Sequence, residues 1–215
     1  MRPDELEARY QQALSRGEEV WGLEVLIRLR DHLRARRYPE ALALLEREKE
    51  ALRPLLGTIS PEELAQGIRA LEESPEAFLD HPFLGAEAWN LLGLKRLENK
   101  EEAEAAFREA LARDRGHLRA LVNLGNLHLE RGEVEEAIRL YQQALRQDPD
   151  FPQAHHNLAA AYRRKGQLEE AVFHLKKSQR LLMRPSSGER EGAGRPIWLW
   201  LLLLALLYLL GSRLR

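Results

Sequence analysis

Two neighbouring segments of the chain share one pattern at a spacing of 34 residues. The first segment is 118–149, LRALVNLGNLHLERGEVEEAIRLYQQALRQDP, and the second is 152–182, PQAHHNLAAAYRRKGQLEEAVFHLKKSQRLL. Each carries two apolar stripes at helical spacing, separated by a glycine turn. A fixed period of this length is typical of repeat architectures, in which each unit buries its apolar face against the next. This repeat constrains the fold more than any other feature of the sequence.

Glycines and other small residues take equivalent places in this pattern. Gly132 and its counterpart Gly166 are expected to supply the positive-φ residue that closes the first helix of each unit. Gly125 and Ala137 are small where the two helices of a unit must approach closely. Pro149 marks the end of a second helix. Because no segment shows strand alternation or a hairpin turn signal, we expect an all-α fold.

The period and these residues resemble the tetratricopeptide repeat (TPR), a helix–turn–helix unit of 34 residues that stacks into a solenoid. The residues that match the signature of that family are Leu124, Gly125, Gly132, Ala137, Tyr141, Ala144 and Pro149. The last unit departs from the pattern near its end, as a capping repeat does. The resemblance implies an all-α, TPR-type helix-turn-helix solenoid.

A third unit precedes the other two. Its second helix keeps the period, because Phe107 lies 34 residues before Tyr141, whereas Gly93 in its first helix comes two residues too late. We therefore expect a shortened turn in which Asn99 takes the place of the glycine. The three TPR units are expected at 85–117, 118–151 and 152–183.

The match to the 34-residue repeat becomes weaker toward the N-terminus. Residues 1–53 are expected to form degenerate TPR-like helices, and residues 54–84 an irregular helical connector. The connector carries two helix starts, Ser60 and Ser74, each an N-cap residue followed by proline and acidic residues.

In TPR proteins the first helix of each repeat lines a concave face, which usually binds peptides. By this resemblance the partner-binding groove is lined by Arg119, Val122, Asn123, Asn126, Gln153, His156, Asn157, Arg163 and Arg164. Asn126 and Asn157 match two asparagines of the carboxylate clamp in chaperone-binding TPR domains. That clamp also needs a lysine where this chain has Val122, and two basic residues where it has Ser187 and Glu191. We therefore do not expect chaperone-tail binding.

Two of these assignments have a structural alternative. Asn123 and Asn157 can satisfy backbone groups between helices, which is common in this repeat. Arg163 and Arg164 can form a solvated face rather than attract an acidic ligand.

The C-terminal region has a different composition. A polar linker at 184–196, rich in Gly, Ser and Pro, is followed by IWLWLLLLALLYLL, which has nine leucines and no charge. This run spans about 21 Å at about 1.5 Å per residue, less than the ~30 Å of a bilayer core. Its leucines nevertheless contribute about 3–5 kcal/mol of insertion energy. We expect a transmembrane tail anchor at 197–211, marked by Ile197, Trp198, Trp200, Tyr208 and Leu210.

Two other interpretations of this apolar run stay open, namely a helix that docks on the repeats and burial in an oligomer. A docked helix should show a polar face, and this run is apolar all round. The charged, amphipathic N-terminus lacks the apolar run of a signal peptide. We therefore expect a single-pass membrane protein, with the lipid bilayer as one partner and the repeat domain in the cytoplasm.

Composition argues against several other classes of protein. The formal net charge of −1 gives no support for nucleic acid as a partner. The chain has no cysteine, which removes disulfides and thiolate chemistry. Its seven histidines form no paired metal motif, and no phosphate-binding or nucleophile-elbow motif occurs. No catalytic residue, cofactor or metal is expected, and we do not expect an enzyme.

These features together predict a membrane-tethered TPR scaffold that binds a protein or peptide partner in its concave groove. An assembly factor for a membrane complex is the concrete version of this prediction. The alternative is a soluble, self-inhibited TPR module whose apolar tail docks in its own groove.

Overall fold

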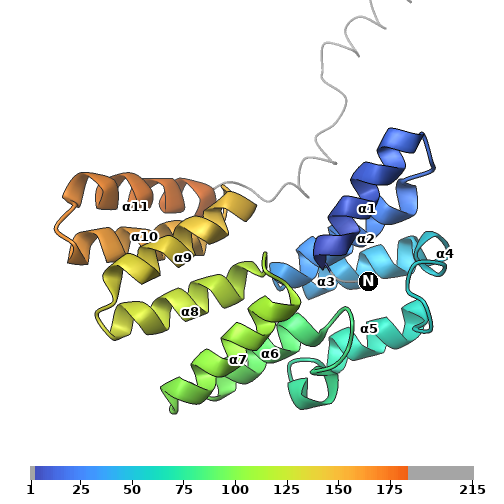
Figure 1. Ribbon diagram of the computed structural model, residues 1–215, viewed down its shortest axis with the longest axis horizontal. Coiled ribbons are helices and arrows are strands. Elements are labelled where there is room, and N and C mark those ends of the chain that lie inside the picture. Colours follow the sequence, from blue (N-terminus) through green and yellow to red (C-terminus); the bar gives the residue numbers. More distant parts are fainter. Residues whose placement is uncertain (1–2, 184–215) are drawn as a thin grey trace, which may run out of the picture. The chain divides into compact units, whose positions relative to one another are not determined.

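The computed structural model describes residues 3–183 of the chain, and residues 1–2 and 184–215 lie outside that part (Figure 1). The expected linker and the expected tail anchor, including Ile197, Trp198, Trp200, Tyr208 and Leu210, therefore fall outside the described residues. Within residues 3–183, none of the helices combines the length and the apolar character that crossing a bilayer requires.

The secondary structure of residues 3–183 consists of helices joined by loops and turns, which confirms the all-α class. The N-terminal helices are α1 (Pro3–Arg16), α2 (Trp21–Arg34), α3 (Tyr38–Arg47) and α4 (Lys49–Leu52). The expected connector contains α5 (Pro61–Ala70) and the 3₁₀ helix η1 (Pro75–Phe78). The repeats contain α6 (Gly85–Lys95), α7 (Lys100–Arg113), α8 (Leu118–Glu130), α9 (Val134–Gln147), α10 (Pro152–Arg164) and α11 (Leu168–Leu182).

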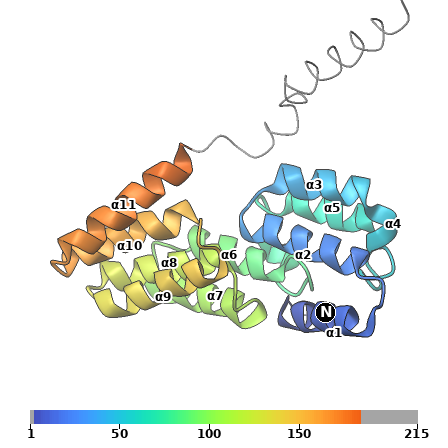
Figure 2. The ribbon, with the colours of Figure 1, turned by 90° about the horizontal axis from the view of Figure 1, so that it is seen from above.

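The helices pack mainly against their neighbours along the chain. Helix α2 contacts α1, α3 and α4, and α3 also contacts α5 (Figure 2). In the repeats, α6 packs on α7 and α8 on α9, and the pairs join through α7 with α8 and α9 with α10. The first helices α6, α8 and α10 also contact one another in series, as in a solenoid.

Two of the helix pairs bring a glycine of the first helix against an aromatic ring of the second. A Cβ atom on Gly93 would lie 2.5 Å from the Phe107 ring, and one on Gly125 would lie 2.6 Å from the Tyr141 ring. Both rings are fully buried. The glycines therefore allow an aromatic side chain to pack directly on the backbone of the first helix.

The turns between paired helices confirm one prediction and correct another. Gly132 has a φ of 84° and Gly166 a φ of 82°, as predicted for the closing residue. Asn99, expected to replace such a glycine, has a φ of −106° and instead caps α7, its side chain accepting a hydrogen bond from Glu102 N. The prediction for Asn99 is therefore wrong.

The two residues missing from the first repeat come from its first helix rather than from its turn. Helix α6 ends at Lys95, two residues after Gly93, whereas α8 ends at Glu130, five residues after Gly125. The α6–α7 connection has four residues, 96–99, against three in 131–133. It is thus longer than a standard turn, and Asn99 at its end begins the next helix.

The two helix starts predicted in the connector differ in outcome. Ser60 forms a capping box, since its hydroxyl accepts from Glu63 N and the Glu63 carboxylate accepts from Ser60 N. Ser74 makes no side-chain cap, and the segment after it is only the short 3₁₀ helix η1.

Candidate functional site

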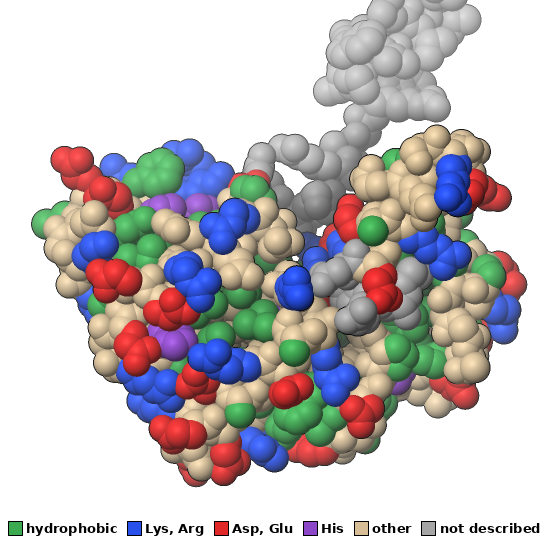
Figure 3. Space-filling model, in the orientation of Figure 1, with side chains coloured by type: hydrophobic (Ala, Val, Ile, Leu, Met, Phe, Trp, Pro, Cys, Tyr) green, Lys and Arg blue, Asp and Glu red, His purple; other side chains and the backbone are tan. Residues whose placement is uncertain are grey.

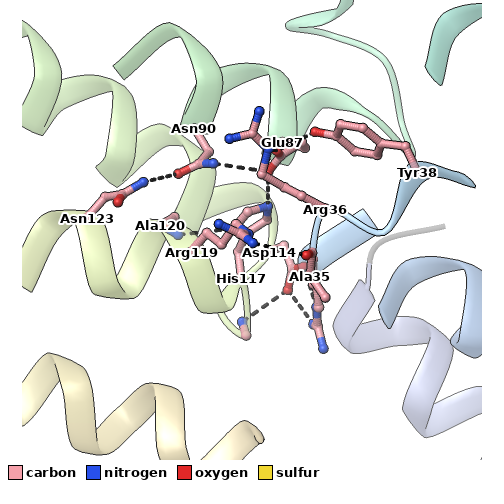
Figure 4. A network of polar contacts seen from close by, with 12 residues as sticks. Ala35, Arg36, Tyr38, Glu87, Asn90, Asp114, His117, Arg119, Ala120 and Asn123 are labelled. Carbon is pink, nitrogen blue, oxygen red and sulfur yellow. Dashed lines mark hydrogen bonds and ion pairs between the residues drawn. The ribbon is translucent and has the colours of Figure 1, made fainter. Parts of the chain in front are cut away.

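A buried polar network joins the N-terminal helices to the first two repeats (Figure 4). Its centre is the carboxylate of Glu87 on α6, a residue that is only 2% exposed. The partners of Glu87 are Tyr38 OH at 2.6 Å, Arg36 Nε at 3.3 Å, Asn90 Nδ2 at 3.1 Å and His117 Nε2 at 3.0 Å. Both carboxylate oxygens are therefore satisfied by partners from α3, α6 and the start of α8.

His117 is held in one orientation by this network. Its Nδ1 accepts a hydrogen bond from Ala120 N at 3.2 Å, which caps α8. A neutral ring that accepts at Nδ1 carries its proton on Nε2, and Nε2 is the atom that faces Glu87. Burial, followed by the charge of Glu87, raises the pKa of Tyr38, so this phenol stays protonated and donates.

A second buried carboxylate, Asp114, is bound by Arg34 of α2. Arg34 Nε donates to Asp114 Oδ2 at 2.7 Å, and Nη2 donates to the other oxygen, which makes a bidentate pair between residues 80 apart in sequence. Gly116 N also donates to Asp114 at 3.0 Å. Burial opposes ionisation of Asp114, but the pairing with Arg34 holds its pKa below the ordinary value.

The α2–α3 turn has the geometry of a repeat turn without its glycine. Residues 35–37 match 131–133 in length, and Arg36 has a φ of 55° where Gly132 has 84°. A positive φ is uncommon for a residue with a side chain. The Arg36 guanidinium pairs with Glu72 and Glu87, and these ion pairs hold the turn.

Three of the predicted groove residues are buried or are hydrogen-bonded to other segments of the chain. Arg119 Nη2 donates to Ala35 O at 3.2 Å, and burial lowers the pKa of Arg119. Val122 is buried at 5% exposure, and Asn123 donates to Asn90 Oδ1 at 2.8 Å. The α2–α3 turn therefore contacts α8 at Arg119, and α6 contacts α8 at Asn123 (Figure 4).

Asn126 of α8 and Asn157 of α10 are hydrogen-bonded to each other. Asn157 Nδ2 and Tyr141 OH both donate to Asn126 Oδ1, each at 2.7 Å. The partners of Asn123 and Asn157 are thus side-chain amides, where the structural alternative expected backbone groups. In residues 3–183, Asn126 Nδ2 and Asn157 Oδ1 make no hydrogen bond.

The remaining predicted groove residues lie on α10. Gln153, His156 and Arg163 are exposed, and within the described part of the chain their side chains make no hydrogen bond or ion pair. Arg164 is also on this side of α10 and donates to Leu129 O of α8. The predicted residues Arg119, Val122 and Asn123 on α8 are therefore bonded or buried, whereas Asn126 and the residues on α10 form the more open part of the predicted groove.

A cavity of about 230 Å³ lies beside the polar network. Charged groups in its lining are already paired, Arg34 with Asp114 and Glu87 with Arg36. Its walls are largely apolar and include Leu6, Leu26, Leu29, Leu33 and Phe83. With its charges matched, the cavity offers apolar surface rather than reactive groups.

Sequence analysis missed this polar network. One signal was present, namely the single acid Glu87 in the otherwise apolar helix GAEAWNLLGL. A charged residue on a buried helical face needs a partner. Its partners come from distant segments, however, and helical spacing does not show which ones.

Three family models match the repeat region of the chain. Models of the tetratricopeptide repeat match residues 98–141 and 152–181, and a model described as TPR repeat matches residues 125–166. Residues 98–181 are tetratricopeptide repeats. No curated protein matches the chain by sequence.

Several solved structures resemble the chain at low identity. The second TPR of Spaghetti (RPAP3), bound to an HSP90 peptide, is 23% identical with a TM-score of 0.43, over 45% of this chain and 91% of that chain. A crystal structure of MamA is 25% identical with a TM-score of 0.44, over 67% and 88% of the two chains. A second MamA structure is 23% identical with a TM-score of 0.44, over 80% and 97%. These likenesses carry no argument about function.

Proposed function

We propose that the protein is a TPR scaffold that binds an acidic peptide segment of a protein partner on α10 and the adjoining part of α8. One observation carries this proposal. On α8, Arg119 bonds to the α2–α3 turn and Asn123 bonds to α6, while the side chains of Gln153, His156 and Arg163 on α10 stay exposed without a partner in residues 3–183. The binding surface is accordingly the α10 part of the groove.

The chemistry of this surface favours an extended acidic ligand. Arg163 has no carboxylate partner in the described residues, so it attracts negative charge. Asn126 Nδ2 and Asn157 Oδ1 offer one donor and one acceptor, which suits the backbone of an extended peptide. Together these groups would recognise the negative charge and the main-chain amides of the ligand rather than a particular apolar side chain.

Arg163→Glu is expected to weaken binding of a fluorescently labelled peptide of alternating Asp and Glu about tenfold, because attraction becomes repulsion. The measurement is fluorescence anisotropy with the full chain in non-ionic detergent. The matched control is Arg69→Glu, which makes the same charge change at an exposed arginine on α5.

The control distinguishes binding at the proposed α10 surface from an effect of the net charge of the protein. Arg69→Glu should leave the affinity within about twofold of the unmodified chain. Equal losses in both variants would show that only net charge matters, and absence of binding by the unmodified chain would contradict an acidic ligand.

We further propose that residues 197–211 tether the scaffold to a membrane, with the repeats on the cytoplasmic side and a component of a membrane complex as partner. The support is the uncharged, leucine-rich sequence of this segment. A tether raises the effective concentration of the repeats near partners in the same bilayer.

After a carbonate wash, the full chain is expected to stay in the membrane fraction, and a chain ending at Arg184 is expected to be soluble. The physical reason is the loss of about 3–5 kcal/mol of leucine insertion energy. Protease cleavage of the repeats from the cytoplasmic side of sealed vesicles tests their orientation. A full chain that is soluble would instead support the self-inhibited module, in which the apolar tail docks in the groove.

A further inference from the structure

Helix α11 exposes an apolar strip along one face. The strip consists of Leu168, Val172, Leu175 and Leu182, which are 64%, 50%, 39% and 68% exposed. Their spacing of three, four and seven residues places them on one side of the helix. Figure 3 shows hydrophobic side chains over α11, at the upper left, among Lys, Arg and His side chains.

In the preceding repeat, the residues at the equivalent positions are buried. Ile138 and Tyr141 on α9 lie 34 residues before Val172 and Leu175, and they are 8% and 0% exposed. In that repeat the strip is covered from two sides, because Tyr141 packs on Gly125 of its own repeat and α10 of the next repeat packs against α9. On α11 no following helix among residues 3–183 packs over the equivalent strip.

The charges beside the strip form a second, independent pattern. Glu169 and Arg180 make no ion pair or hydrogen bond in the part of the chain that the structure describes. They are eleven residues apart, about three helical turns, so they lie on one side of α11. Glu169 precedes Leu175 by six residues and Arg180 follows it by five.

We propose that α11 is a self-association surface, on which two copies of this chain pack their strips antiparallel around a two-fold axis near Leu175. In that arrangement Glu169 of each copy faces the other copy's Arg180. Leu168 of each copy likewise meets the other copy's Leu182. An interface around a two-fold axis must be self-complementary, and this helix combines apolar and charged complementarity to itself.

The test is the association of the full chain in non-ionic detergent, measured by sedimentation velocity over a range of concentrations. The unmodified chain should be a dimer, and Leu175→Glu should be a monomer. Glu169→Arg and Arg180→Glu should each raise the dimer dissociation constant about tenfold, because each places like charges opposite each other. The double variant restores opposite charges and should return within about threefold of the unmodified value.

Leu14→Glu is the matched control, since Leu14 is an exposed leucine on α1 at 47% exposure. It should leave the dimer unchanged, and circular dichroism should show native helix content in every variant. A monomeric unmodified chain would overturn the proposal. So would a dimer that persists in Leu175→Glu, as association through the apolar tail predicts, or a charge swap that fails to restore association.

Discussion

Arg34→Ala is expected to lower the free energy of unfolding by about 3–5 kcal/mol, the cost of breaking a buried ion pair from one side. The variant leaves Asp114, 2% exposed in the structure, without its bidentate partner. The same pair joins α2 to the end of α7, so the contact between the N-terminal helices and the repeats weakens as well. Chemical denaturation followed by circular dichroism measures the loss.

Two comparisons isolate the buried pair. Arg69→Ala removes an exposed arginine from α5 and should change stability by no more than about 0.5 kcal/mol. Replacing both partners, in Arg34→Met with Asp114→Asn, should recover much of the loss, because neither charge of the pair remains and the amide oxygen can still accept from Gly116 N. A cost below about 1 kcal/mol for Arg34→Ala would contradict the proposed role of the pair.

The cost of Arg34→Ala should also depend on pH. The folded-state pKa of Asp114 lies below its usual 3.8, so the pair stabilises the fold above that pH, and this contribution is lost as the pH falls through the folded-state pKa. Without Arg34, the largest opposition to burial is gone, so the pKa of Asp114 is higher in the folded variant than in the folded unmodified protein. The difference in unfolding free energy between the two proteins is therefore expected to be full at neutral pH, to shrink as the pH falls through the higher pKa of the variant, and to vanish below the lower pKa of the unmodified protein.

Gly125→Ala is expected to destabilise the repeats by about 1–3 kcal/mol through overpacking. Helix propensity alone predicts the opposite, a gain of about 1 kcal/mol. The added Cβ would lie 2.6 Å from the ring of Tyr141, which is fully buried and has no room to move aside. Thermal and urea denaturation measure the change.

The third repeat suggests the control for this prediction. There Ala159 stands at the place of Gly125, and Leu175 stands at the place of Tyr141. In a Tyr141→Leu background, Gly125→Ala should therefore be neutral or stabilising. An equal loss in both backgrounds would show that the aromatic ring is not the cause.

Local features of the fold could be predicted because their causes lie within a few residues. The turns at Gly132 and Gly166 follow from the freedom of glycine at positive φ, and the start of α5 follows from the reciprocal bonds of Ser60 and Glu63. The three helix pairs follow from apolar spacing that recurs every 34 residues.

The first repeat shows where local inference stops. A two-residue deficit between Gly93 and Phe107 is compatible with a shorter turn or with a shorter helix. The structure shortens α6 and lengthens the connection, because Asn99 is a better N-cap than a closing residue. Both arrangements keep Phe107 against Gly93, so the spacing of apolar residues does not distinguish them.

The candidate groove shows the same division. The repeat pattern placed nine residues on first helices, but it could not show that Ala35 accepts a hydrogen bond from Arg119, 84 residues away. That contact depends on how the α2–α3 turn meets α8. It bears on the function we propose, since it leaves α10 and the adjoining part of α8 as the proposed binding surface.

By itself, the sequence determined the helical class, the period of the repeats and the positions of their glycine turns, because short-range sterics and apolar spacing set these features. Only the tertiary structure decided which first-helix residues stay uncovered and which buried charges pair. Those outcomes depend on contacts between segments such as Arg34 and Asp114, 80 residues apart. A buried charge requires a partner, but its own segment does not specify which residue that partner is.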